Sequence, residues 1–214
     1  MIISLLAVLF GTTLLYIAVV SRIEAYIKMT ALQGLCLFLI AITGIILEGH
    51  FRSLGTIVIA VETLGLKAII IPWYMTKVTR ENDVLREGAA HASHLSSLIA
   101  VAVILAVGIL LPFSVKDLGV IPPLFFGISL AAVATGFFLI ITRKNLMTHV
   151  AGYMVIENGI FLLSLGVAKE MPIMVSLGVS LDIFLGVFLA GMFIRRIQGT
   201  FNRQHIDTLT DLKD

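Results

Sequence analysis

Seven long apolar runs divide this sequence, and each is close to the length of a membrane-spanning helix. A helix needs about 20 apolar residues to cross the hydrocarbon core of a bilayer. Only 13% of the residues are charged, against about 25% in soluble domains. The sequence therefore predicts an all-α fold, a polytopic membrane bundle of about seven transmembrane helices. The runs cover residues 2–20, 27–47, 53–76, 95–113, 120–142, 146–168 and 172–194.

The basic residues between the runs predict how the chain is oriented. Eleven Lys and Arg follow runs one, three, five and seven, and three lie on the other side. The side that is richer in Lys and Arg is usually the cytoplasmic side. We therefore expect the N-terminus outside and the C-terminus in the cytoplasm.

The runs fall into two groups that a polar connection separates. We expect a three-helix region over residues 1–76, a cytoplasmic loop over 77–94, a four-helix region over 95–197 and a polar cytoplasmic tail over 198–214. The loop is interpreted either as a solvated connection or as a docking site for a partner.

Four ionisable side chains lie deep within the apolar runs. Placing Asp, Lys or Arg at the centre of a spanning helix costs about 2.5–3.5 kcal/mol each, so such residues are usually functional. Burial disfavours the charged form of a carboxylate, which lets it exchange a proton near neutral pH. A structural role in helix–helix hydrogen bonding is the alternative. We predict proton transfer by Glu157, Asp182, Lys67 and Glu62, with His149 as a further candidate.

Lys67 is the expected positive partner of the membrane carboxylates. The alternative is that its side chain extends to the cytoplasmic interface. Glu62 lies five residues before Lys67, about 140° around an ideal α-helix, so we expect the two to face different neighbours. Pro72 is expected to disturb the same helix near its cytoplasmic end.

Glycines near the two C-terminal carboxylates predict close helix packing. Gly152 and Gly159 flank Glu157, and small residues let helices approach one another in membranes. Gly178, Asp182 and Gly186 recur every four residues, which places them on one helix face. We therefore expect Asp182 to face the bundle interior.

The sequence contains no motif for catalysis or for a cofactor. Cys36 is the single cysteine, so there is no disulfide framework and no cysteine cluster for zinc or iron–sulfur. No phosphate-binding loop, GxSxG or HExxH motif is present. We expect no metal, no cofactor and no catalysis by this chain alone, and a net charge of +2 does not indicate nucleic acid.

The C-terminal part resembles a known family. The stretches RKNLMTHVAGYMVIENG and PIMVSLGVSLDIFLGVFLAGMFIRRI, with the ending LTDLK, resemble component E of hydrogenase-4 and formate hydrogenlyase complexes. The resemblance continues through LKAIIIPWYM, around Lys67. The same C-terminal half is similar to the small K subunit of respiratory complex I and to the C subunit of multi-subunit sodium/proton antiporters. Glu157 and Asp182 match the paired acids of the K subunit, which usually has glutamate at the second position. Glu62 matches neither family.

The resemblance implies a non-redox membrane subunit of a group 4 nickel–iron hydrogenase or a related oxidoreductase. Its acids would serve proton or sodium translocation coupled to electron transfer. It implies antiporter-like membrane subunits as partners, peripheral redox subunits with nickel–iron and iron–sulfur centres as indirect partners, and the inner membrane of a bacterium or archaeon, in contact with lipid. The alternatives are a structural scaffold subunit and a subunit of a sodium/proton antiporter.

Overall fold

The regular elements of this protein are helices throughout the part of the chain that is described. The computed structural model describes residues 2–48, 57, 59–81, 93–114, 122–167 and 191. The all-α class is confirmed for these residues. The elements are α1 (Ile2–Val19), α2 (Ile23–Glu48), η1 (Val61–Ile70), α4 (Ile71–Glu81), α5 (His94–Ser114), α6 (Pro123–Thr142) and α7 (Leu146–Val167).

Helices long and apolar enough to cross a membrane account for five of the predicted runs. They are α1, most of α2, α5, α6 and most of α7. The third run corresponds to η1 and α4, which follow one another without a break and end at Glu81, five residues beyond the predicted end. The seventh run lies outside the described residues except for Gly191, which is helical and buried. Seven spans and the orientation of the termini stay predictions.

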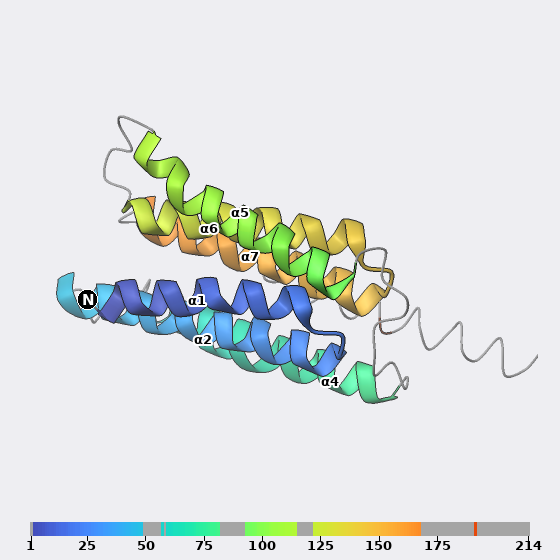
Figure 1. Cartoon of the computed structure of the whole chain (residues 1–214). Helices are drawn as coiled ribbons and strands as arrows, with labels where there is room; N and C mark the ends of the chain where they lie inside the picture. The colour runs from blue at the N-terminus through green and yellow to red at the C-terminus, as the bar shows by residue number, and fades with distance from the viewer. Residues whose placement is uncertain are drawn as a thin grey trace, which may run out of the picture.

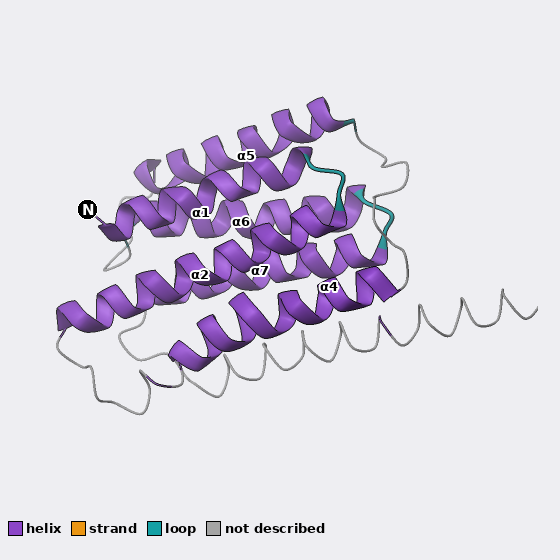
Figure 2. Ribbon diagram, turned by 90° about the horizontal axis from the view of Figure 1, so that it is seen from below, coloured by secondary structure: helices purple, strands orange, loops and turns teal. Residues whose placement is uncertain are grey.

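The helices form two layers. Helices α5, α6 and α7 make one layer, and α1, α2 and the η1–α4 helix make the other (Figure 1). The layers meet where α2 packs on α7 and where α1 packs on α5 and α6. Turned by 90°, the bundle shows α2 between α1 and α4 (Figure 2). This arrangement brings a face of α7 toward both α2 and η1.

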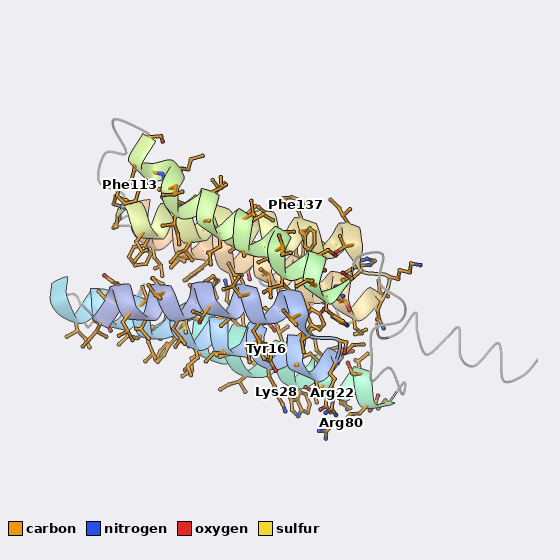
Figure 3. The ribbon with its side chains drawn as sticks, in the orientation of Figure 1. Tyr16, Arg22, Lys28, Arg80, Phe113 and Phe137 are labelled. Atoms are coloured by element: carbon orange, nitrogen blue, oxygen red, sulfur yellow. The ribbon has the colours of Figure 1, made fainter. Side chains whose placement is uncertain are left out.

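The bundle has an apolar outer surface as well as an apolar core. Phe10, Leu14 and Ile17 of α1 are fully buried, spaced as one face of a helix requires. On the outer surface, Phe113 is 78% exposed and Phe137 is 54% exposed, and both point away from the bundle (Figure 3). Helices that are apolar on all sides are typical of membrane spans.

Basic side chains gather at the end of the bundle where α1 and α4 finish and α2 begins. Arg22, Lys28 and Arg80 lie there (Figure 3). Arg143 is buried at the end of α6, and its Nη2 donates to the carbonyl oxygen of Ala18 over 2.8 Å. The same end is the one that the Lys and Arg count assigns to the cytoplasm.

The third run contains a π-helix, which sequence reasoning did not predict. At the end of η1, the backbone N–H of Ile71 bonds to the carbonyl of Leu66, five residues earlier. Pro72 follows directly, and a proline lacks an N–H and crowds the carbonyl four residues before it. The wider π-helical turns directly precede Pro72, whereas the disturbance was expected near the cytoplasmic end of the run, which follows it. Pi-helical segments are rare and occur frequently at functional sites.

A buried ionic cluster as the candidate functional site

Lys67 and Glu157 form an ion pair inside the bundle. Lys67 of η1 is 1% exposed and Glu157 of α7 is 6% exposed, and the Lys67 Nζ contacts the Glu157 Oε1. The interpretation that the Lys67 side chain extends to the interface is wrong, because its ammonium group points inward between two helices. The structure thus brings these two predicted residues together, and their role in proton transfer stays a prediction.

Glu62 joins the same pair, contrary to the expectation that it faces a different neighbour. Its Oε1 lies 3.8 Å from the Lys67 Nζ, and the residue is 1% exposed. The expected separation of about 140° holds for an α-helix with 3.6 residues per turn. In a π-helix the hydrogen bonds span five residues, so Glu62 and Lys67 lie one turn apart on the same face. We call Glu62, Lys67 and Glu157 the ionic cluster.

An aromatic ring also contacts the ammonium group of Lys67. The Lys67 Nζ lies over the ring of Phe161, 4.1 Å from its centroid. Phe161 is one helical turn beyond Glu157 on α7, so both side chains reach η1 from the same face. A cation over an aromatic face gains about 0.5–2 kcal/mol, more when water is excluded. The ammonium group is therefore held by two carboxylates and a ring.

Gly34 of α2 allows η1 to come close enough to place Lys67. A Cβ atom at position 34 would lie 3.0 Å from the carbonyl carbon of Lys67 and 3.1 Å from its Cβ. Only a residue without a side chain fits this contact comfortably. Sequence reasoning missed Gly34 and its neighbour Gln33. The signal that could have found them is the polar Gln33 in the middle of an otherwise apolar run.

A chain of buried polar side chains lies beside the ionic cluster. Asn158 Nδ2 donates to Gln33 Oε1 over 3.2 Å, and Gln33 Nε2 donates to Thr13 Oγ1 over 2.8 Å. Thr13 Oγ1 donates in turn to the Phe10 carbonyl over 2.6 Å. All three side-chain residues are 3% exposed or less. This amide chain, Thr13–Gln33–Asn158, links α1, α2 and α7.

The predicted close approach of α7 at its glycines is confirmed, and the helix that it meets is α6. A Cβ atom at Gly152 would lie 3.1 Å from the carbonyl oxygen of Gly136, and one at Gly159 would lie 2.8 Å from the Ala132 Cβ. Gly136 packs equally closely, since its Cβ would lie 2.6 Å from the Gly152 carbonyl oxygen. The backbones of α6 and α7 are therefore nearly in contact.

His149 does not join the ionic cluster. His149 is half-buried, and its Nε2 is 2.8 Å from the carbonyl oxygen of Arg143. It precedes Glu157 by eight residues, or about 12 Å along the helix axis. Asp182 lies outside the described residues. Cys36 is buried in the core, and the described residues contain no group of three or more metal-ligating side chains.

Comparison with known proteins gives full-length relatives. A protein of Mycobacterium tuberculosis, the uncharacterized protein Rv0085, is 30% identical over 217 residues, which are 95% of this chain and 93% of that protein. The chain belongs to the same family as Rv0085. Hydrogenase-4 component E of Escherichia coli K12 is 27% identical over 220 residues, which are 100% of this chain and 98% of component E. Component E of Shigella flexneri gives the same values.

The similarity to component E is weak but extends over the full length. It supports the family resemblance that the C-terminal residues and the stretch around Lys67 indicate, and the matched residues cover the whole chain. Such similarity and the apolar helices fit a membrane subunit of a hydrogenase-type complex. No family model and no solved structure matches the chain.

Proposed function

We propose that this chain is a non-redox membrane subunit of an energy-converting complex of the hydrogenase type. In this proposal a partner arm that carries nickel–iron and iron–sulfur centres transfers electrons, and this chain contributes to ion translocation in the inner membrane. The full-length similarity to component E supports this assignment. The similarity of the C-terminal half to the K subunit and to antiporter subunits suggests antiporter-like neighbours.

The observation that carries the proposal is the ionic cluster. Two carboxylates share one ammonium group in a site that is nearly closed to solvent. Burying two negative charges around one positive charge is costly, and a proton on Glu157 would remove one of the negative charges. A change in the distance between Lys67 and either acid would then move that proton. Glu157, Lys67 and Glu62 are the proposed proton-carrying residues, and Asp182 and His149 are proposed to extend the path.

The same arrangement favours protons over sodium as the translocated ion. A sodium site needs several oxygen ligands and no competing cation, because hard cations bind to oxygen atoms. Here an ammonium group already contacts both carboxylates. Moving one charge against 100 mV requires about 2.3 kcal/mol, which is within the range that electrostatic interactions in a low-dielectric site supply.

The test is to replace Glu157 in the assembled complex and measure proton pumping alongside electron transfer. The expected result for Glu157→Gln is normal assembly and normal electron transfer with lost pumping. Glu24→Gln is a matched control, because Glu24 pairs with Arg80 at the exposed end of the bundle, with 3.7 Å between the two groups. Unchanged pumping by Glu157→Gln at normal assembly would exclude the relay role.

The outcomes also separate the two alternative functions. A scaffold subunit predicts that Glu157→Gln is silent and that Glu157→Leu impairs assembly, because only the amide can still form hydrogen bonds. An antiporter subunit predicts a native preparation without nickel–iron or iron–sulfur proteins. Co-purification of such proteins with this chain favours the hydrogenase-type complex.

A further inference from the structure

The hydrogen bonds of the amide chain fix the direction in which each of its members points. The Thr13 hydroxyl gives its proton to the Phe10 carbonyl, so its oxygen can only accept from the Gln33 side chain. The Gln33 NH2 group is thereby used, and its carbonyl oxygen accepts from the Asn158 NH2 group. Asn158 must then present its Oδ1 at the free end of the chain.

This Oδ1 is a buried acceptor that has no hydrogen-bond partner among the described residues. Asn158 is 1% exposed, and in the described part of the chain no group donates to its Oδ1. Buried polar atoms in native proteins nearly always have a partner, either protein or ordered water. Rotating the Asn158 amide by 180° would place its oxygen against the Gln33 Oε1 and break the hydrogen bond between the two side chains. Asn158 Oδ1 therefore needs a hydrogen-bond donor.

We propose that the amide chain holds Asn158 Oδ1 as the acceptor for one ordered water molecule beside Glu157. Asn158 follows Glu157 directly, so the two side chains lie at the same depth. A buried water needs two to four polar partners. Asn158 Oδ1 supplies one, and the carboxyl group of the adjacent residue Glu157 is proposed as a second.

Gln33 and Thr13 are then positioning residues for proton transfer at Glu157. A water that donates to Asn158 Oδ1 keeps its lone pairs free, so its oxygen can accept a hydrogen bond from a protonated Glu157 carboxyl group. This role rests on the proposed function. It gives Thr13 of α1 and Gln33 of α2 a part in that function. Neither is among the ionisable residues that the sequence pattern indicates.

The experiment removes the anchor of the chain farthest from the ionic cluster. In the assembled complex, Thr13→Val frees the Gln33 NH2 group, so both amides can turn over and Asn158 no longer has to present its oxygen. We expect pumping to fall by a factor of about ten or less, as for the loss of one hydrogen bond, and its pH profile to shift. Thr13→Ser should restore both.

Thr30→Val is the matched control. Thr30 is also fully buried, and its Oγ1 bonds to the Ile27 carbonyl over 2.9 Å as Thr13 does to Phe10, but it has no bond to the amide chain. Its pH profile should equal that of the unchanged protein. A Thr13→Val profile equal to that of Thr30→Val would overturn the positioning role.

A high-resolution map of the complex tests the water site separately. Density for a water within hydrogen-bond distance of Asn158 Oδ1 is expected, and a protein donor at that position would overturn the site. Loss of pumping in Glu157→Gln together with an unshifted Thr13→Val profile refutes this inference alone. Full pumping in Glu157→Gln refutes the proposed function.

Discussion

Helix α7 presents two opposite faces that contact their neighbours by different physical means. Gly152 and Gly159 lie on the face toward α6, where backbones approach closely. Glu157 and Phe161 lie roughly 150° around the helix from these glycines, on the face toward η1, where the contacts are ionic and aromatic. The face toward α6 packs through close backbone contact, and the face toward η1 binds through an ion pair and an aromatic contact.

This difference separates what holds the bundle together from what can respond to a proton. The close contacts of Gly136, Gly152 and Gly159 between α6 and α7 involve only uncharged groups, so a change in protonation leaves them unaltered. The α7–η1 contact depends on the charge of Glu157 and of Lys67. A fixed contact on one side and a charge-dependent contact on the other suit a helix that carries a protonation site. Substitutions on the two faces should therefore have different consequences.

The largest effect is expected for Lys67→Met. It leaves two buried carboxylates without their shared cation, and removing one partner of a buried pair costs about 3–5 kcal/mol. The thermal stability of the assembled complex should fall sharply, and pumping should be lost. Lys77→Met is the control, since Lys77 pairs with Glu81 on an exposed surface, where such pairs contribute about 0.3–0.5 kcal/mol. Equal stability of the two variants would show that the ionic cluster is not formed.

A smaller effect is expected on the opposite face of α7. Gly136→Ala places a Cβ atom 2.6 Å from the Gly152 carbonyl oxygen, and overpacking of this kind costs about 1–3 kcal/mol. Thermal stability should fall, but the complexes that assemble should pump normally per electron transferred. Reduced pumping at full assembly would break the separation between the two faces.

The smallest effect on stability is expected for Gly34→Ala. Its Cβ would lie 3.0 Å from the Lys67 backbone, so η1 must move by a few tenths of an ångström. The complex should assemble, and pumping should decrease because Lys67 shifts relative to Glu157. Gly44→Ala on the same helix is the control, because a Cβ there meets nothing within 4 Å. Identical pumping in the two variants would mean that the position of Lys67 is not critical.

The sequence alone predicts the helices and the acids better than it predicts their geometry. Apolar runs of spanning length leave little choice but helices, and an acid such as Glu157 inside a run is visible from its energetic cost. The prediction that Glu62 and Lys67 face different neighbours was wrong, because nothing in the residue pattern indicates a π-helix. Gln33 was missed because an uncharged polar residue costs less than a charged one and so stands out less.

The glycines illustrate the same limit. The sequence indicates that Gly152 and Gly159 permit close packing, but it does not say which helix they meet. The structure shows α6. Gly34 has no neighbouring acid to draw attention to it, and its role appears only once α2 and η1 are placed side by side.

The central claim, that Glu157 changes its protonation during turnover, is tested most directly by infrared difference spectroscopy of the working complex. We predict a carboxyl band that appears or disappears with turnover, is absent in Glu157→Gln and is retained in the control Glu24→Gln. The same band in Glu157→Gln, at unchanged intensity, would contradict the account.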